Sequence, residues 1–336
     1  MKTLKTLFNI QLFAWSQGQA GTPTVNPVNI TTQSSMSPTM KPFIDTYLLE
    51  NARESSIFTQ FGKQEKMKGN KIEWRKFDTF AKALTPLQEG VIPSGQTFGM
   101  TKIEATTTQH GDYTVITDRL SREAFDNVVV GATEEMGAAM GETYDTLTRN
   151  ILVAGNSVMY CPNGDTEVTS RNGITKDCVL TPDVVNRAYT WLKKNKAPLI
   201  DGKYIALIHP SVVYDIRKSE EWNDAHKYSA TTEIFNGEIG ELHKVRFIET
   251  NNAKIWKDGD TCVYATLFLG KDAFGVLNPE GEGTEMIVKR EDEIGGPLNQ
   301  FSTIGYKFCH GAKILYQERM LRVESGSFYS DVDEAN

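Results

Sequence analysis

The sequence predicts an α+β protein, and three observations support that fold class. A stripe of apolar residues marks one long helix over residues 126–155. Short segments in which apolar and polar residues alternate, such as Lys71–Phe77, mark strands. Residues 78–97 separate two of these strands and have no periodic pattern of their own. A helical period, several two-residue periods and a long irregular insertion together indicate a mixed fold with a projecting loop.

The long helix is predicted from apolar residues that recur three and four positions apart. They are Ala132, Met136, Met140, Tyr144, Leu147, Ile151 and Ala154. Asp126 or Asn127 can cap the start of this helix, and Gly155 can end it. The helix is therefore expected to be amphipathic, with one side against a core.

Three glycines, Gly131, Gly137 and Gly141, lie inside this helix. Each costs a helix interior about 1 kcal/mol relative to alanine. One interpretation is that they are tolerated weak spots in a long helix. The other is that strands or a neighbouring subunit cross the helix closely at these positions. The sequence leaves both interpretations open.

The composition bounds the class of protein. The chain has 336 residues, of which 39% are hydrophobic and 24% are charged, and its formal net charge is −7. These values indicate a soluble globular protein with a large core and room for two domains. Lys and Arg form no block, which disfavours a groove for long duplex DNA, because binding phosphates takes clustered basic residues.

The cysteines and the N-terminus place the chain in a reducing compartment. Four scattered cysteines (Cys161, Cys178, Cys262 and Cys309) form no CxxC pair, so we expect reduced, mostly buried thiols rather than a zinc or thioredoxin-like site. The apolar run near the N-terminus is interrupted by polar residues, so a signal peptide is the less favoured alternative. No segment is long and apolar enough to cross a membrane.

The chain before and after the long helix divides into recognisable segments. Residues 16–40 are polar and rich in Gly and Pro, which predicts an extended or disordered arm, and a short amphipathic helix is expected from Pro42. Thr181 and Pro182 start a second helix, and Tyr204–Ile208 reads as a short buried strand. Further strands are expected at 245–249, 262–269, 286–289, 304–317 and 320–324, before a loose acidic tail.

The tip of the irregular loop carries apolar residues between Thr85 and Gly95. Apolar residues on a projecting hairpin indicate that something else covers them. The alternative is a hairpin that folds back onto its own domain. The sequence alone does not separate these two readings.

No motif of an active site is present. The sequence lacks a GxxxxGK[ST] phosphate loop, a GxGxxG turn, a GxSxG elbow and an HExxH helix. The five histidines are isolated, so a structural role is expected for them. The acidic stretches 291–293 and 331–334 favour solvated turns over cation sites. We therefore predict no catalytic, cofactor or metal site, and a structural or interaction protein rather than an enzyme.

Several stretches resemble major capsid proteins of tailed bacteriophages of the N4-type family, which share the Hong Kong 97-type fold. They include Phe8–Ala14, Lys71–Phe77, Thr85–Leu87, Glu89–Val91, Gly111–Tyr113, Ile116–Asp118, Gly141–Asp145 and Ile208–Ser211. These matches hold in order and at similar spacing, and together they cover most of residues 40–220.

The resemblance implies a division of the chain, which we state as an expectation. Residues 1–40 are a flexible N-terminal arm, 41–62 an N-terminal helix region, 63–110 an extended loop (E-loop) hairpin, 111–179 a peripheral domain with spine helix 126–155, 180–275 mainly an axial domain, 276–324 return strands to the peripheral domain, and 325–336 a loose C-terminal tail.

The resemblance also implies a function. Copies of the chain would form pentamers and hexamers of an icosahedral shell around double-stranded phage DNA, without sequence-specific binding or a membrane. Scaffolding, portal and decoration proteins are the expected partners, and the shell would be assembled in the cytoplasm of the bacterial host. Strand alternation and the tip sequence make Trp74, Arg75, Gln88 and Glu89 candidate contacts between subunits.

Two rival functions stay open. An encapsulin-like compartment shell would share the fold class but enclose a cargo enzyme. An enzyme with a dispersed active site in residues 180–275 would instead form a small oligomer with a ligand pocket.

Overall fold

The computed structural model describes residues 29–30, 56–67, 69–78, 80–84, 86, 89–90, 92, 95–123, 128–222, 238–259, 261–279, 284–289, 293–294, 298 and 300–336. For residues 29–30, 121–123, 128–129, 238, 258 and 279 it describes the backbone alone. The expected N-terminal arm apart from Asn29–Ile30, the helix after Pro42, the caps Asp126 and Asn127, and the candidate contact Gln88 lie outside these ranges.

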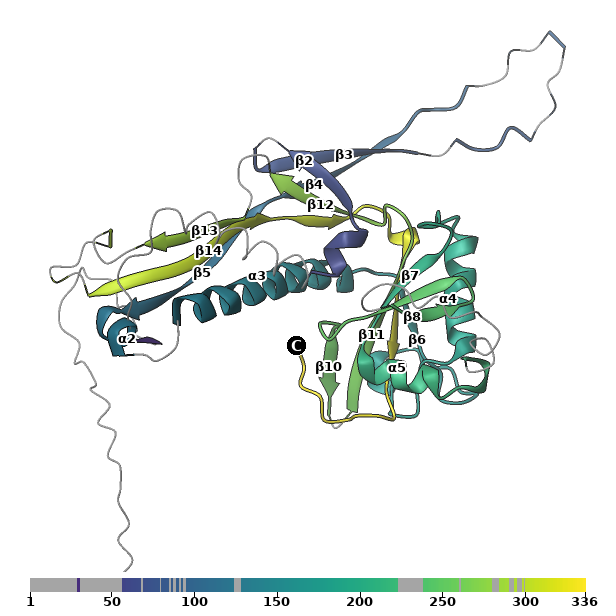
Figure 1. The fold of residues 1–336 in the computed structure, drawn as a ribbon. Helices are drawn as coiled ribbons and strands as arrows, with labels where there is room; N and C mark the ends of the chain where they lie inside the picture. Colours follow the sequence, from purple (N-terminus) through teal and green to yellow (C-terminus); the bar gives the residue numbers. More distant parts are fainter. Residues whose placement is uncertain are drawn as a thin grey trace, which may run out of the picture.

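The chain forms an elongated part, a compact lobe and a projecting hairpin (Figure 1). In the elongated part the long helix α3 (Val128–Val153) runs beside a four-stranded sheet. The lobe lies at the C-terminal end of α3 and contains a seven-stranded sheet with helices α4 (Pro182–Lys194) and α5 (Pro210–Arg217).

The four-stranded sheet has the order β1 (Asn29–Ile30), β5 (Thr108–Thr117), β14 (Phe301–His310) and β13 (Glu285–Lys289). Strand β14 is antiparallel to both β5 and β13, and β1 is parallel to β5. The short helix α2 (Asp118–Glu123) follows β5. The apolar stripe of α3 faces this sheet, where Met140 packs against Tyr306 and Phe308 of β14.

The helix glycines differ in their surroundings. A Cβ atom placed on Gly131 would meet nothing within 4 Å, and this glycine is exposed. Gly137 and Gly141 are both buried. Gly131 is therefore a tolerated weak spot, whereas the burial of the other two is compatible with a close approach.

The lobe is built on a sheet whose central strands are covered on both faces. Its order is β6 (Val158–Tyr160), β16 (Met320–Ser325), β11 (Thr261–Leu269), β7 (Tyr204–Ile208), β9 (Val245–Glu249) and β8 (Glu238–Leu242), with β10 (Ile255–Asp258) paired to β11. One face packs against α4 and α5 in the largest core cluster. The other face packs against the end of α3, which explains why every residue of β7 is buried.

Strand β16 departs from the expected return of residues 276–324 to the peripheral sheet. Strands β13 and β14 lie in the four-stranded sheet, but β16 pairs with β11 and β6 inside the lobe. All six residues of β16 are buried, and such a strand needs neighbours on both sides and cover on both faces.

Two smaller sheets complete the fold, and the second of them is the projecting hairpin. One has the order β15 (Ala312–Ile314), β12 (Phe274–Pro279) and β2 (Lys63–Met67), and the other pairs β3 (Lys71–Phe77) with β4 (Met100–Thr106). Short 3-10 turns lie at η1 (Phe58–Phe61), η2 (Arg171–Gly173) and η3 (Gln317–Arg319).

The C-terminal tail is held against the lobe instead of being loose. The Asp333 carboxylate accepts a hydrogen bond from the Tyr264 hydroxyl at 2.6 Å and from the Ser211 hydroxyl at 3.1 Å. The Ser327 hydroxyl donates to the Ser211 carbonyl at 3.0 Å, and Ser327 is buried. The polar composition that suggested a loose tail thus supplies the hydrogen bonds that attach it.

Candidate interaction surface

The base of the β3–β4 hairpin is fixed to the body of the protein. In β3, Ile72 and Trp74 are half-buried while their neighbours are exposed, as the alternating sequence predicts. Trp74 lies over Gly275 of β12, where an added Cβ atom would sit 2.8 Å from the indole ring. A side chain at position 275 would therefore displace Trp74, so the glycine permits this contact.

The opposite face of the hairpin is charged near the base. The Lys102 ammonium lies 2.8 Å from Glu73 and 2.5 Å from Glu104, and Lys71 also pairs with Glu104. Hydrogen bonds from Lys102 and Lys71 lower the pKa of Glu104 to about 2. This ladder of exposed charges joins the two strands and keeps this part of the hairpin soluble.

Farther from the base the same hairpin carries exposed aromatic side chains. Phe77, Phe80 and Phe98 form a cluster whose ring centroids lie 5.0 Å (Phe77–Phe98) and 5.8 Å (Phe80–Phe98) apart. All three are more than half exposed, and so are Leu84, Ile92 and Met100. We call these six residues the apolar hairpin surface.

This surface decides between the two readings of the loop. Leu84 is 83% exposed and Ile92 is 93% exposed, so the described part of the chain does not cover them. A monomeric protein rarely leaves so many large apolar side chains together in water. The described part of the hairpin is thus not folded back onto its own domain.

The structure places the four predicted contact residues differently. Trp74 packs inside its own subunit, as described above. Arg75 is 64% exposed at its side chain and lies 3.5 Å from Glu73. Glu89 is exposed in a turn with Gly90, whose φ of 77° lies in the left-handed region. Gln88 lies outside the described residues.

Arg75 also borders a groove of about 260 Å³ at the hairpin base. Three further basic side chains line it, from Lys63, Lys76 and Arg319, together with the single acidic residue Asp272. The buried indole Nε1 of Trp74, another lining residue, has no hydrogen-bond partner in the described part of the chain.

Sequence reasoning recognised apolar residues at the tip but missed the aromatic cluster. The sequence placed Phe77 and Phe98 in two candidate strands, 71–77 and 98–108, and left Phe80 in the loop between them without a role. The available signal was three phenylalanines at the two mouths of a long loop, where cross-strand neighbours come together.

Two of the histidines, His209 and His310, have structural surroundings. The His209 ring accepts a hydrogen bond from the Ser211 amide at 3.2 Å and so caps α5. His310 is buried with its ring 2.9 Å from the Thr148 hydroxyl, and burial lowers its pKa to about 4. Among the described residues, no three His, Cys, Asp or Glu side chains gather closely enough to hold a metal ion.

Within the same described ranges, no helix combines the length and apolarity needed to cross a membrane. Three cysteines, Cys161, Cys178 and Cys262, are buried as free thiols, and Cys309 is half-buried.

Comparisons with solved structures show the fold. The capsid of Ralstonia phage GP4 matches with a TM-score of 0.64 at 14% identity, covering 82% of this chain and 88% of that chain. The capsid of cyanophage Pam1 matches with a TM-score of 0.61 at 11% identity, covering 94% and 99%. The SrpI encapsulin of Synechococcus elongatus matches with a TM-score of 0.52 at 11% identity, covering 82% and 88%.

Among curated proteins, none matches the chain. The family described as phage capsid protein matches residues 101–308, which is more than half of the 336 residues. That range contains β4 except Met100, together with α3 and most of the lobe. It also contains the four-stranded sheet, except for β1 and the last two residues of β14. The chain therefore belongs to the phage capsid protein family, and its role is that of a structural protein of a bacteriophage capsid.

Proposed function

We propose that the chain is the major capsid protein of a tailed bacteriophage of the N4-type family with the Hong Kong 97-type fold. Copies assemble through heterologous contacts into pentamers and hexamers, which close into an icosahedral shell around double-stranded DNA. One observation carries this proposal: the apolar hairpin surface projects from a folded body and is left uncovered by the described part of the chain.

Burial of this surface on a neighbouring copy supplies the free energy of assembly. Burying one phenylalanine side chain contributes about 1.5–3 kcal/mol. Three phenylalanines per subunit give a modest favourable contact, partly offset by the ordering of the loop. A closed shell repeats that contact in every subunit, so weak individual contacts suffice.

The proposed division of the chain follows the expectation from the sequence, with two changes. Residues 1–40 form the N-terminal arm, 63–110 the E-loop, 111–179 the peripheral domain and 180–275 mainly the axial domain. Strand β16 is assigned to the axial domain because it pairs with β11. The tail after Ser325 is assigned to the same domain because its hydrogen bonds are with Ser211 and Tyr264.

Among the candidate contacts, we assign direct roles to Arg75, Gln88 and Glu89. Arg75 and Glu89 are exposed on the hairpin, which supports a contact with another subunit. Trp74 contributes indirectly, because it holds the hairpin base against β12.

The partners of the shell follow from the same proposal. Scaffolding, portal and decoration proteins bind it during or after assembly in the host cytoplasm. DNA is enclosed without sequence-specific binding. A net charge of −7 and the exposed Glu134, Glu135 and Glu142 along α3 support a container that does not grip DNA tightly.

A second candidate function is an encapsulin-like compartment, which the likeness to the SrpI encapsulin favours. The two candidates differ in what the shell encloses. Particles purified from cells that express the chain within its own gene cluster would contain DNA in the first case and a protein cargo in the second.

Negative-stain electron microscopy with sedimentation of the purified chain tests the proposal. We expect closed shells or rings of five and six subunits. A variant lacking Leu84–Gly95 should stay folded but form no shells. Normal shells from this deletion variant would refute the role of the hairpin. A wild-type chain that stays monomeric even when co-expressed with its neighbouring genes would refute the shell itself.

A further inference from the structure

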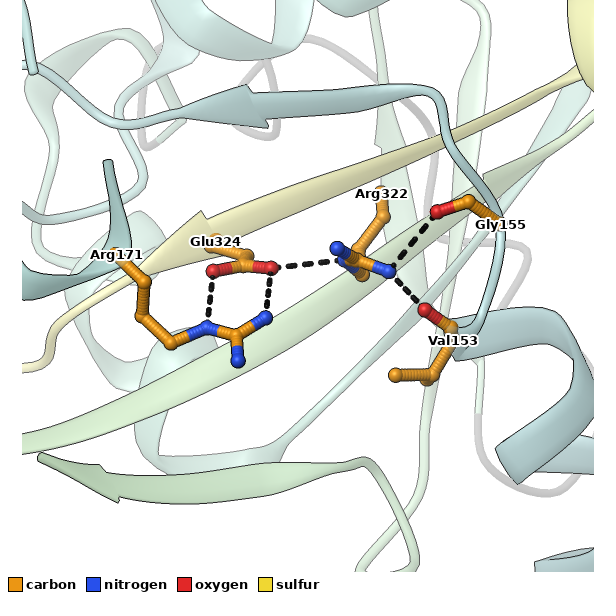
Figure 2. Close-up of polar contacts among 5 residues, drawn as sticks. All are labelled: Val153, Gly155, Arg171, Arg322 and Glu324. Atoms are coloured by element: carbon orange, nitrogen blue, oxygen red, sulfur yellow. Dashed lines mark hydrogen bonds and ion pairs between the residues drawn. The ribbon is translucent and has the colours of Figure 1, made fainter. Parts of the chain in front are cut away.

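A buried ionic network joins the end of α3 to the lobe. Glu324 of β16 is fully buried, and its two carboxylate oxygens accept hydrogen bonds from Arg171 at 2.6 and 2.7 Å (Figure 2). Arg322, two positions away on the same face of β16, donates to Glu324 at 2.8 Å. One carboxylate is thus held between two guanidinium groups.

Arg322 also binds the last turn of the long helix. Its Nη1 donates to the carbonyl oxygens of Val153 and Gly155, the latter at 3.1 Å (Figure 2). The last carbonyls of a helix have no partner within the helix and carry partial negative charge, so a guanidinium satisfies them well. The direction of α3 is therefore tied to a strand in the middle of the lobe.

The outer side of the network is closed by an indole ring. Arg171 of η2 stacks on Trp256 of β10 at 3.6 Å from the ring centroid, and Arg322 lies 5.5 Å from the same ring. Backbone bonds flank the network on both sides: the Arg322 amide donates to the Ser157 carbonyl, and the Cys161 amide donates to the Glu324 carbonyl. Four separate segments of the chain thus meet in this network, which has the Glu324 carboxylate between its two guanidinium groups.

Such an arrangement is an inefficient way to gain stability. Buried ion pairs lose hydration on folding, and apolar residues of similar volume often stabilise a core as well or better. What the charges add is geometry, because a bidentate pair and a carbonyl cap are satisfied together in one arrangement only.

Small changes in that arrangement are amplified along α3. The helix has 26 residues and packs against β14 around its middle, where Met140 contacts Tyr306 and Phe308. At a rise of 1.5 Å per residue, a rotation of about 5° at its C-terminal end moves the far end by roughly 3 Å. The four-stranded sheet should move together with the helix, because Met140 of α3 packs against its strand β14.

We propose that Arg171, Glu324 and Arg322 are positioning residues that fix the direction in which α3 leaves the lobe, and through it the angle between neighbouring subunits in the shell. The effect on the angle between subunits rests on the proposed capsid function, whereas the effect on the direction of α3 does not. The direction of α3 is a property of the single subunit and can be measured without assembly.

The experiment compares E324Q and R171Q with a matched surface control, R187Q. Arg187 pairs with Asp183 at 2.8 Å on α4, and both side chains are more than half exposed. E324Q and R171Q are the two network variants. R171Q is the milder of them, because the Arg171 side chain is 31% exposed, so the network can be tested with R171Q even if E324Q fails to fold. Hydrogen exchange of the isolated subunit and the diameters of assembled particles are measured for each.

In the subunit we expect amide exchange at residues 154–156 to accelerate about tenfold in E324Q and R171Q, since the carbonyl cap loosens when its ionic partner is lost. Exchange within α4 should stay unchanged, and R187Q should behave as the wild type. In particles, the spread of diameters should increase about twofold for E324Q and R171Q, because the angle between neighbouring subunits is no longer fixed.

If the amides of residues 154–156 exchange at the wild-type rate in a folded E324Q or R171Q subunit, the proposal is overturned. Accelerated exchange together with particles of wild-type diameter and spread would overturn the link to shell geometry. If the wild-type chain itself forms no particles, the capsid proposal fails by its own test, while the exchange measurement still decides whether the network fixes α3.

Discussion

In the lobe, Phe247 and Phe268 are at most 1% exposed, whereas in the hairpin Phe77 and Phe98 are 59% and 60% exposed. The same side chain is therefore used in two ways within one subunit. The lobe covers its apolar residues with two helices, a second core cluster and a tail. The hairpin has no such cover among the described residues, so its apolar residues are available to another copy of the chain.

The largest expected effect comes from replacing phenylalanine by alanine, once in the lobe and once in the hairpin. The first change should impair folding and the second should impair assembly. Phe247→Ala should lower the free energy of unfolding by about 3–5 kcal/mol, because it opens a cavity in a packed core. Phe98→Ala should change it by less than about 0.5 kcal/mol, since an exposed side chain loses little on truncation. Chemical denaturation of the isolated subunits measures both values.

The same pair should reverse its order in an assembly assay. Phe98→Ala should raise the concentration needed for shell formation, while any surviving folded Phe247→Ala subunit keeps its intact hairpin. A large loss of subunit stability in Phe98→Ala, with normal assembly, would contradict the distinction between the two regions.

Acid should affect the packing of α3 before it affects the hairpin. Burial, and to a lesser extent His110, lowers the pKa of His310 from its usual 6.5 to about 4. The unfolded chain therefore binds a proton that the folded chain refuses, and stability falls by up to about 3 kcal/mol as the pH drops from 6.5 to 4.

Asp145 of α3 acts in the opposite direction and must be counted with His310. Burial raises its pKa to about 6 from 3.8, although its carboxylate accepts a hydrogen bond from the Phe58 amide at 2.7 Å. The folded state then takes up a proton first, so stability is gained as the pH falls from 6 toward 3.8.

His310→Gln tests this balance. The variant should lose the part of the acid-dependent destabilisation that His310 causes, so its stability should fall less than that of the wild type between pH 6.5 and 4. Thermal unfolding of the wild type and the variant across this range is the measurement. An unchanged fall in the variant would mean that another group causes the acid sensitivity.

A smaller effect compares two glycines. Gly131→Ala should raise the stability of the subunit by up to about 1 kcal/mol, because the new methyl group meets nothing and helix propensity improves. Gly275→Ala should lower it by about 1–3 kcal/mol, because the methyl group collides with Trp74. Thermal unfolding measures both, and a neutral Gly275→Ala would contradict the proposed anchoring of the hairpin base.

The smallest expected effect concerns the exposed charges of the hairpin. Arg75→Gln and Glu89→Gln should each weaken assembly by about 0–1 kcal/mol per contact, as exposed ion pairs do, and salt should diminish the difference. The concentration needed for shell formation at low and high salt gives this value. Lys193→Gln on α4 is a control outside the hairpin.

The elements that local periodicity specifies were predictable. The apolar stripe predicted α3, the alternation at Lys71–Phe77 predicted β3, and the apolar run at Tyr204–Ile208 predicted β7. The Thr181–Pro182 start of α4 was also predictable, because a cap and a proline act within one turn.

A strand at 320–324 was predicted, but the features that depend on distant parts of the chain, its complete burial and its partners, were not predictable. Strand β16 carries Arg322 and Glu324 at alternating positions, which reads as a half-exposed strand, yet every residue in it is buried. Arg171, 153 positions away, makes this burial possible, and no local pattern announces that partner. The tail was predicted to be loose for a related reason. Its polar side chains can bind water, but they can equally form hydrogen bonds with distant residues such as Ser211 and Tyr264.

The candidate surface was predictable in kind but not in detail. The sequence showed apolar residues at the tip of a loop, and the structure adds an aromatic cluster beside them that the described part of the chain leaves exposed. Trp74 illustrates the limit, because alternation placed it on one face of a strand without indicating that Gly275 lies beneath that face.

Thiol labelling of an Ile92→Cys variant shows whether a second copy of the chain covers the hairpin in assembled particles. Ile92 is 93% exposed in the subunit, and the native cysteines are buried or half-buried, so the wild type supplies the background rate. We expect rapid labelling of the isolated subunit and labelling at least about tenfold slower in assembled particles, because a second copy covers the hairpin. Equal labelling rates in subunits and particles would contradict it.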